Sequence, residues 1–439
     1  MTEPVRIIGA GFAGCEAAWQ LAKRGIPVTL CEMKPVRFSP AHSSENLAEL
    51  VCSNSFKAMR ISSAAGMMKE EMRMLSSLCL ECADECSVPA GGALAVDREK
   101  FSRAVTEKIL ACEGITLVRE EVTEIPDGNV IIAAGPLASE ALSEKIAEIS
   151  GGCLSFYDAA APIVTAESID MSRAFMQSRY DRGDPDDYIN CPMDKEEYEA
   201  FYDALINAES AGVHSFDKRK DVYEGCMPVE VMASRGKDTI RYGPMKPAGL
   251  TDPATGRRPY ANLQLRKENR DGTMYNLVGF QTNLRFSEQK RVFSMIPALR
   301  EAEFVRYGVM HRNTFLNSPG FLNPDFSVIE RPSLFFAGQI TGVEGYMESA
   351  ASGILAGINT ARRIAGLDMF IPPETTILGS LARYVADTSV KDFQPMGAAF
   401  GLLPPLETRI RNKQERYEKT ALRGLGDLKT QLSSDRFFM

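Results

Sequence analysis

The chain of 439 residues has only one tryptophan and three histidines, and it has no uninterrupted apolar run of eighteen residues. Without such a run, no membrane-spanning helix is expected. Basic residues are in the minority, 50 against 58 acidic residues, which gives a net charge of −8. This balance argues against non-specific coating of nucleic acid, but it leaves open an RNA that is bound through one local basic patch.

A secretory signal and a disulfide framework are also missing. The apolar segment 5–9 leads directly into predicted structure, and the ten cysteines lack regular spacing. We therefore expect reduced thiols and a cytoplasmic protein. With 44% hydrophobic and 25% charged residues, the composition is that of a globular protein of two or three domains with its own core.

The N-terminal segment predicts a strand–helix–strand unit. Residues 5–9 are apolar, residues 15–23 favour a helix that ends at Gly25, and residues 27–32 form the next apolar stretch. Two strands joined by one helix over such a short distance lie parallel, with a right-handed crossover.

A dinucleotide-binding fingerprint lies at the first turn of this unit. Its glycines allow a tight turn, a close approach of a pyrophosphate and close packing of helix on strand. Glu32 follows at the end of the second strand, where an acid accepts hydrogen bonds from the ribose hydroxyls. The fingerprint, which we expect to bind the cofactor together with Glu32, is Gly9-Ala10-Gly11-Phe12-Ala13-Gly14.

A second glycine-rich element appears late in the chain. Residues 333–338 again read as a strand followed by glycine, and residues 349–364 form a helix of small residues. A second backbone cradle suits FAD, whose flavin half extends far from its adenosine. No second G-x-G-x-x-G motif occurs, so NADPH or NADH would have to reach the flavin directly. The residues of this element that we expect to contact the cofactor are Gly338, Gln339, Gly342, Gly345 and Tyr346.

The rest of the chain predicts a discontinuous first domain. Residues 64–85 read as one helix, a further helix follows Asp97, and residues 115–118 and 129–134 read as strands. The middle of the chain is richer in Tyr, Arg, Asp and Pro, and the segments between Gly236, Gly243, Gly249 and Gly256 could be strands. The last thirty residues read as polar and helical, with residues 409–413 included.

We therefore predict an α/β fold in which a mixed α/β domain is inserted into a Rossmann-like FAD-binding domain. The expected parts are residues 1–165 for the first half of the FAD-binding domain, 166–320 for the inserted α/β domain that would bind the substrate, and 321–439 for the second half with C-terminal helices.

Two cysteines stand in unusual contexts. Cys52 has small polar neighbours, and Cys226 lies in a turn-like Gly-Cys-Met-Pro sequence, whereas Cys15 and Cys31 fall inside the βαβ unit and should be buried. Three others have the spacing C-x₂-C-x₃-C, which could suggest a cluster, a zinc site or a redox dithiol. On a helix, however, this spacing merely places them on one packed face, and we expect no metal. These three are Cys79, Cys82 and Cys86.

Four stretches together resemble one family, the folate- and FAD-dependent tRNA (uracil-5-)-methyltransferases, often called TrmFO. The likeness covers essentially the whole chain. The stretches are residues 9–14, 50–55 (Leu-Val-Cys-Ser-Asn-Ser), 224–228 (Glu-Gly-Cys-Met-Pro) and 335–346 (Phe-Phe-Ala-Gly-Gln-Ile-Thr-Gly-Val-Glu-Gly-Tyr).

The resemblance implies methylation of uracil C5 at position 54 in the T loop of tRNA, which gives 5-methyluridine. The one-carbon unit would come from 5,10-methylenetetrahydrofolate, FAD would carry and reduce it, and NADPH or NADH would reduce the flavin. It also implies that Cys226 and Cys52 are the two functional thiols, with Cys226 as nucleophile at C6 and Cys52 as acid or base. The reverse assignment of the two thiols stays open.

The expected partners are folate and the T arm of tRNA, with no membrane and no required protein partner. Tyr346 could stack on flavin, folate or base. The candidate cations for RNA are Arg219, Lys220, Arg257, Arg258, Arg285, Lys290, Arg291, Arg409, Arg411 and Lys413.

Three alternative functions remain. One is a tRNA-modifying flavoprotein of the wobble-uridine family, which is usually longer. Another is an NAD(P)H-dependent flavin disulfide or quinone reductase, which would need a redox dithiol and usually a second nucleotide motif. The third is a flavin-bound RNA-binding module without enzymatic activity, which a measured turnover with a methylene donor would exclude.

Overall fold

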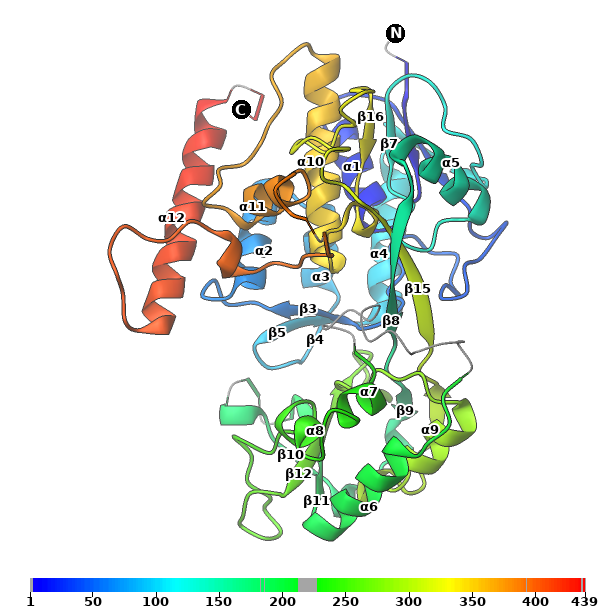
Figure 1. Ribbon diagram of the computed structural model, residues 1–439, viewed down its shortest axis with the longest axis vertical. Helices are drawn as coiled ribbons and strands as arrows, with labels where there is room; N and C mark the ends of the chain where they lie inside the picture. Colours follow the sequence, from blue (N-terminus) through cyan, green and yellow to red (C-terminus); the bar gives the residue numbers. More distant parts are fainter. Residues whose placement is uncertain are drawn as a thin grey trace.

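The chain forms two lobes, which Figure 1 shows one above the other in a computed structural model. The structure describes residues 3–181, 183–184, 186–211, 227–391, 393–435 and 437–438, without the side chains of residues 153–158, 181, 311 and 312. Within these residues, no helix combines the length and the apolar character that crossing a bilayer requires.

A parallel sheet of five strands is the centre of the upper lobe. Each neighbouring pair of strands is parallel, as the βαβ pattern predicts, and the inner strands are almost continuously apolar because helices cover the sheet. In spatial order the strands are β16 (Leu334–Phe336), β7 (Val130–Ile132), β1 (Val5–Ile8), β2 (Val28–Glu32) and β6 (Ile115–Arg119).

Helices α1 (Phe12–Ala22) and α10 (Tyr346–Ile364) lie side by side against this sheet (Figure 1). They can approach closely because α10 presents glycines to α1. A Cβ atom on Gly353 would lie 2.2 Å from the carbonyl oxygen of Ala13, and one on Gly357 would lie 2.8 Å from that of Ala17. The packing therefore ties the early glycine-rich turn to the late one.

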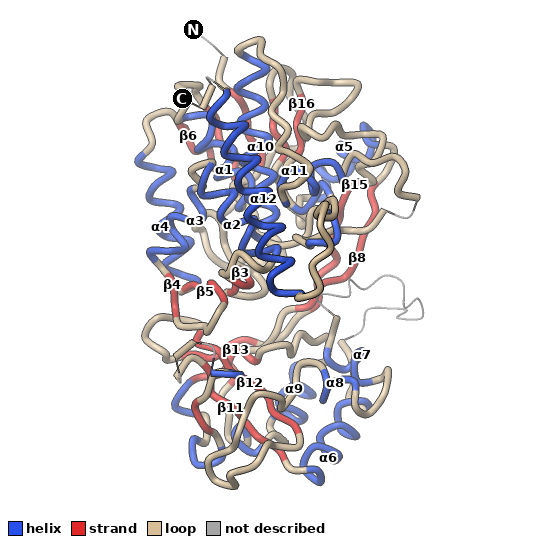
Figure 2. The backbone as a smooth tube through the Cα atoms, turned by 90° about the vertical axis from the view of Figure 1, so that its left-hand side faces the viewer, coloured by secondary structure: helices blue, strands red, loops and turns tan. Residues whose placement is uncertain are grey.

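The lower lobe contains a six-stranded sheet, and every neighbouring pair of its strands is antiparallel. The long antiparallel strands β8 (Cys153–Ala159) and β15 (Met310–Leu316) run between the lobes, and Figure 2 shows the two bodies from the side. In spatial order the sheet is β10 (Phe175–Met176), β11 (Tyr188–Met193), β12 (Ala261–Lys267), β13 (Met274–Leu277), β9 (Ile163–Thr165) and β14 (Phe304–Arg306). The Rossmann-like core with an added domain is thus the observed fold class.

A small antiparallel sheet, β3 (Ser55–Ala58), β5 (Ala93–Val96) and β4 (Ser87–Val88), lies at the lower edge of the upper lobe. The other helices of the upper lobe are α2 (Ala64–Met74), α3 (Leu78–Glu85), α4 (Arg98–Ala111), α5 (Glu140–Ser150), α11 (Ile377–Tyr384) and α12 (Lys413–Ser434). Those of the lower lobe are α6 (Lys195–Ile206), α7 (Val229–Ala233), α8 (Thr239–Tyr242) and α9 (Phe286–Phe293).

The single helix predicted over residues 64–85 is wrong, because the chain breaks between α2 and α3. Ser76 has a positive φ of 56°, and the Ser77 hydroxyl accepts a hydrogen bond from the backbone N–H of Leu80 at 3.2 Å, which caps α3. The same hydroxyl donates to the carboxylate of Glu16 on α1. A cap that is satisfied by another helix therefore overrides the continuous helical pattern.

Two other predictions are corrected. The segments between Gly236 and Gly256 are the short helix α8 and turns, with only an isolated bridge between Asp252 and Arg257, because the glycines stop each segment after a few residues. The C-terminal helix begins at Lys413, after Asn412 caps it by accepting from two backbone N–H groups, so residues 409–412 precede the helix.

Replacing Gly353 tests the packing of α10 on α1. Gly353→Ala is expected to lower the free energy of unfolding by about 1–3 kcal/mol, because the new methyl group overlaps the backbone of Ala13. Chemical denaturation measures this change. Gly426→Ala, in α12 with no heavy atom within 4 Å of the new Cβ, is the control and should be neutral or stabilising by up to about 1 kcal/mol. Equal stability of wild type and Gly353→Ala would contradict the packing.

Candidate functional site

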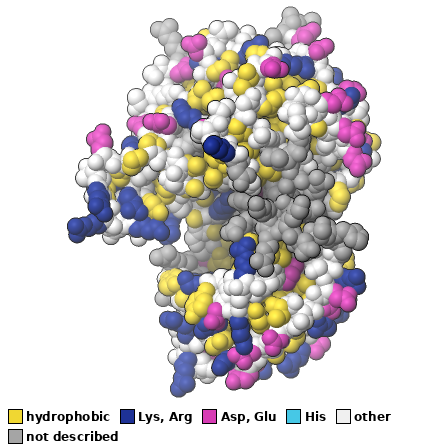
Figure 3. Space-filling view, viewed as in Figure 1, with side chains coloured by type: hydrophobic (Ala, Val, Ile, Leu, Met, Phe, Trp, Pro, Cys, Tyr) yellow, Lys and Arg dark blue, Asp and Glu magenta, His cyan; other side chains and the backbone are white. Residues whose placement is uncertain are grey.

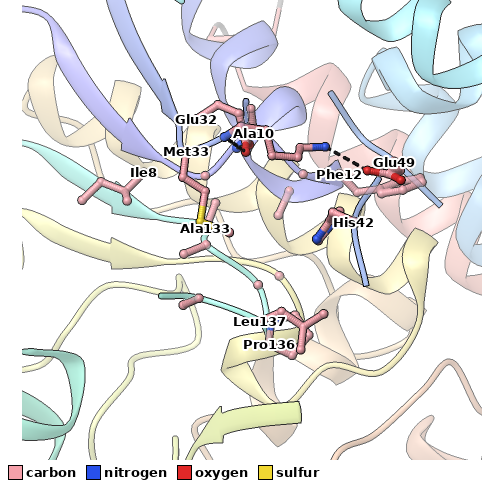
Figure 4. Close-up of a pocket in the computed structure, with 18 of the residues that line it drawn as sticks. Ile8, Ala10, Phe12, Glu32, Met33, His42, Glu49, Ala133, Pro136 and Leu137 are labelled. Carbon is pink, nitrogen blue, oxygen red and sulfur yellow. Dashed lines mark hydrogen bonds and ion pairs between the residues drawn. The ribbon is translucent and has the colours of Figure 1, made fainter. Parts of the chain in front are cut away.

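The carboxyl ends of strands β1, β2, β6 and β7 open onto one cavity, which is continuous with solvent. Figure 4 shows how Ala10, Phe12, Glu32 and Pro136 surround it. In parallel α/β sheets, ligands bind at this end of the strands. The position of the cavity therefore makes it the candidate ligand site.

The first glycine turn has the backbone geometry that a pyrophosphate needs. Gly9 has φ of +98°, and a Cβ there would lie 2.6 Å from the carbonyl oxygen of Ala133. A Cβ on Gly14 would lie 1.9 Å from the carbonyl oxygen of Gly9, so Gly14 serves packing and not the cavity wall. A Cβ on Gly11 meets nothing within 4 Å, which leaves room for a ligand against the backbone.

The N-terminus of helix α1 is open towards this space. Gly11 is the N-cap residue and provides no side-chain hydrogen bond, so no side chain caps the first N–H groups from that position. These groups carry a partial positive charge that suits a phosphate.

Glu32 closes the turn from the end of β2. Its two carboxylate oxygens accept the backbone N–H groups of Ala10, at 2.9 Å, and of Lys34, at 3.0 Å. Each carboxylate oxygen has a further lone pair, so Glu32 can still accept a hydroxyl from a ligand. The carboxylate therefore both fixes the turn and faces the cavity (Figure 4).

The late element reaches the same cavity in part. Gly338, Gln339 and Tyr346 line it together with the first turn, and Gly338 has φ of +87°. Gly342 and Gly345, which were also predicted to contact the cofactor, are not among the residues that line the cavity, and side chains of the protein lie next to them. A Cβ on Gly342 would strike the ring of Phe393, and one on Gly345 would strike the carboxylate of Glu348.

Cys52 lies beside the cavity, in contact with Tyr346. The phenol oxygen of Tyr346 accepts the backbone N–H of Cys52 at 2.9 Å and lies 3.1 Å from its sulfur. Burial, followed by the repulsion of a charged Cys52, holds the pKa of the Tyr346 phenol well above its usual range. The neutral phenol can thus donate a hydrogen bond to the sulfur.

Aromatic packing fixes the Tyr346 ring. Its centroid lies 4.9 Å from that of Phe12 and 6.0 Å from that of Phe56, and Phe101 completes the cluster by stacking on Phe12 at 5.4 Å. Phe12 belongs to the glycine fingerprint, so the cluster connects the dinucleotide turn to the Cys52 contact.

Cys226, the other predicted thiol, lies outside the described residues. Six other cysteines, Cys15, Cys31, Cys79, Cys82, Cys86 and Cys191, are buried packing groups. Cys15 and Cys31 are buried, and Cys79 and Cys82 are fully buried on the packed face that their spacing predicts. Burial raises the pKa of Cys82 to about 12, so this thiol is protonated at neutral pH.

A buried ion pair on the cavity wall was not predicted. Lys34 and Glu49 pair at 3.1 Å, and their side chains are 4% and 8% exposed. Burial, with the nearby Lys34 charge, lowers the pKa of His42, which also lines the cavity. Lys34 follows the carboxyl end of β2, and the rule that ligands gather at such strand ends could have identified it.

Comparison with known proteins places the chain in a family. A sequence profile described as "Glucose inhibited division protein A" matches residues 4–368. A relative from Acetivibrio thermocellus, named methylenetetrahydrofolate–tRNA-(uracil-5-)-methyltransferase TrmFO, is 58% identical over 99% of both chains. The relative of the same name from Halalkalibacterium halodurans is 55% identical over 97% of both chains. The chain belongs to the TrmFO family.

The fold is shared more widely. GidA of Aquifex aeolicus superposes with a TM-score of 0.68 in each of two crystal forms, at 16% and 17% identity. The alignment covers 98% of this chain and 76% or 78% of GidA. As a member of the TrmFO family of methyltransferases, the chain thus has a GidA-like fold.

Glu32 offers a direct test of the dinucleotide site. Glu32→Ala is expected to weaken FAD binding at least about tenfold, because the turn loses its acceptor and the ligand loses a hydrogen bond to a charged group. Titration of the flavin-free protein with FAD, followed by flavin fluorescence, measures the affinity. The exposed Glu124 is the control, and Glu124→Ala should bind FAD as wild type does. Unchanged affinity in Glu32→Ala would remove this residue from the site.

Proposed function

We propose that this protein methylates uracil C5 in the T loop of tRNA, at position 54, to give 5-methyluridine. The one-carbon unit would come from 5,10-methylenetetrahydrofolate, and NADPH or NADH would reduce an FAD held in the cavity. The observation that carries the proposal is the contact of Cys52 with Tyr346, which lines the same cavity as the glycine-rich turn.

The groups that line the cavity support FAD as its ligand. The Gly9–Ala13 turn and the α1 N-terminus would hold the pyrophosphate, Glu32 the ribose, and Gly338, Gln339 and Tyr346 the flavin half. Once reduced by NADPH or NADH, the bound flavin would supply the hydride that converts a methylene group to methyl.

Thiol chemistry explains the two cysteine motifs. Uracil C5 is a weak nucleophile. When a thiolate adds to C6, the ring becomes an enolate, and its C5 carbon can then attack an electrophilic methylene group. We assign this addition to Cys226 and the removal of the C5 proton to Cys52. Loss of that proton would expel the Cys226 thiolate from C6 and leave at C5 the methylene group that is then reduced to methyl. Tyr346 supports the second role, because a neutral phenol 3.1 Å from the sulfur can stabilise the thiolate that accepts the proton.

The arrangement of the strands supports a path by which NADPH or NADH would reach the flavin. Among the described strands, only one sheet is parallel, and its strand ends open onto the FAD cavity. We therefore propose that NADPH or NADH enters this cavity from the flavin side, since the described residues offer no other dinucleotide fold.

Basic side chains near the start of α12 are the proposed contact for tRNA. Arg409, Arg411, Lys413 and Arg416 are exposed, and Lys413 and Arg416 lie over the ring of Tyr417 at 5.5 and 5.4 Å. Figure 3 shows basic side chains gathered on the projecting lower tip of this region, beside the notch between the lobes. In a chain of net charge −8, such a local patch suits a phosphate backbone.

Two of the other candidate cations already form ion pairs, whereas Arg257, Arg258 and Lys290 are exposed. Arg285 contacts Glu209 at 2.5 Å and Arg291 contacts Glu288 at 2.6 Å. Arg219 and Lys220 lie outside the described residues.

Release of tritium from uracil C5 tests the reaction. The flavin-loaded protein, with methylenetetrahydrofolate and NADPH, should release tritium from a T-arm transcript that is labelled at C5. Cys52→Ala should lower the rate at least about 100-fold while the protein keeps its flavin, because the base is lost. Cys112→Ala, a half-buried cysteine at the end of α4, is the matched control and should remain active.

The outcomes separate the alternatives. No release by the wild type would count against methyl transfer, and modification of the wobble uridine instead would favour the other tRNA-modifying class. NADPH oxidation by a disulfide or quinone, without any tRNA product, would favour a reductase.

Charge removal tests the tRNA contact. The double variant Arg409→Gln/Arg411→Gln is expected to weaken tRNA binding about tenfold at low salt and to reduce the salt dependence of log K by about 2, because two phosphate contacts are lost. Filter binding over a series of salt concentrations measures both. Lys108→Gln is the control, since Lys108 is paired with Glu81 and Glu85. Wild-type affinity and salt slope in the double variant would place the RNA elsewhere.

A further inference from the structure

Three arginines converge on the loop that carries Cys52. The loop comprises residues 50–54, immediately before strand β3, and it receives hydrogen bonds from α4, β12 and β14. The two strands, β12 and β14, belong to the sheet of the lower lobe. The loop is therefore held from both lobes, although its sequence neighbours belong to the upper lobe only.

Arg98, the first residue of α4, holds the loop on the side of the upper lobe. Its guanidinium donates to the backbone carbonyl oxygen of Leu50 and, at 3.3 Å, to that of Cys52. Its Nε donates to Glu268 at 2.5 Å. The planar guanidinium thus bridges two carbonyls of the loop and a carboxylate of the lower lobe, which a lysine cannot reproduce.

Arg266, on β12, holds the next two residues of the loop. It donates to the side-chain oxygen of Asn54 at 3.1 and 2.8 Å and to the hydroxyl of Ser53 at 3.1 Å. Asn54 is fully buried, and its amide donates to the carbonyl oxygens of Val96 and Lys267, both at 3.0 Å. Asn54 is therefore fixed to both lobes at once.

Arg306, the last residue of β14, completes the set. It donates to the carbonyl oxygen of Val51 at 2.8 Å, and Val51 lines the FAD cavity. Arg306 is half-buried, so it reaches the loop from the edge of the lower sheet.

Glu268 offsets part of the positive charge of this cluster. Its side chain is 3% exposed, one oxygen pairs with Arg98, and the other has no hydrogen-bond partner among the described residues. A single carboxylate thus serves Arg98, with Arg266 and Arg306 nearby, and the cluster stays net positive around the thiol loop.

We propose that Arg98, Arg266 and Arg306 are positioning residues that hold the Cys52 loop in its place against Tyr346, so that the lower lobe sets the position of the thiol. The inference rests on the proposed function for its importance to methyl transfer, but not for its geometry. A base must lie within hydrogen-bond reach of the proton that it removes, and a displacement of about 1 Å can lower a rate about 100-fold. Buried, charge-assisted hydrogen bonds from two bodies supply such rigidity.

The test uses the flavin-loaded full-length protein and the variants Arg98→Lys, Arg266→Lys and Arg306→Lys. Each variant keeps the positive charge and loses the planar contacts. We expect kcat for tRNA methylation to fall about 10- to 100-fold with the KM for tRNA within about twofold. The rate at which iodoacetamide alkylates Cys52 in the absence of RNA, measured by peptide mass mapping at fixed pH, should differ at least about threefold between each variant and the wild type.

A charge-removing variant separates position from electrostatics. Arg98→Gln should move the pH midpoint of Cys52 alkylation upward, because a cation beside the thiolate is lost, whereas Arg98→Lys should leave the midpoint in place. Arg270→Lys is the matched control. Arg270 lies between β12 and β13, two residues after Glu268. Its side chain is exposed, and its backbone N–H donates to Asp97, the N-cap residue of α4.

Wild-type alkylation and kcat in all three lysine variants would overturn the proposal. If Arg98→Lys or Arg266→Lys loses its flavin through misfolding, the half-buried Arg306→Lys decides, since its side chain makes one loop contact. If the wild type itself methylates no tRNA, the proposed function fails, and the alkylation profiles still decide whether the arginines hold the loop.

Discussion

The close crossing of α1 and α10 is the constraint on which the site depends. Ala13 and Ala17 face Gly353 and Gly357, where any larger residue would meet backbone atoms. This crossing places the first turn of the chain beside a segment more than three hundred residues later. Because these helices touch, Tyr346, at the first position of α10, lies against Phe12 and Cys52, and it lines the cavity together with the first turn. Small side chains in one interface thus determine where the aromatic and thiol groups lie.

The lower lobe adds to this framework through polar contacts and not through a shared apolar core. The apolar clusters of the two lobes are separate, and the contacts between them include Arg266 with Asn54 and Arg98 with Glu268. Hydrogen bonds of this kind fix direction as well as distance, which apolar packing does less strictly. The division of labour follows: the upper lobe provides a dinucleotide cavity, and the lower lobe controls the loop beside it.

Local patterns in the sequence predicted the parts of the site that have local causes. The turn at Gly9 and the acid at Glu32 follow from steric rules over one βαβ unit, and the parallel sheet follows from the same pattern. The break at Ser76 was missed because its cause is Glu16, on another helix. The contacts of the three arginines were missed for the same reason, since most of their partners lie far along the chain. Gly342 and Gly345 share the glycine-rich pattern of the late element, but Phe393 and Glu348 occupy the space beside them.

Strand β16 forms one edge of the parallel sheet, where it pairs with β7 at positions such as Phe336 and Ile132. The whole sheet of the lower lobe is encoded between these two strands. During synthesis, every strand of the lower lobe's sheet therefore leaves the ribosome before β16, the strand that completes the parallel sheet of the upper lobe. Until β16 and α10 emerge, β7 has an open edge and the groove has no second wall, so flavin capture belongs to the last stage of biogenesis.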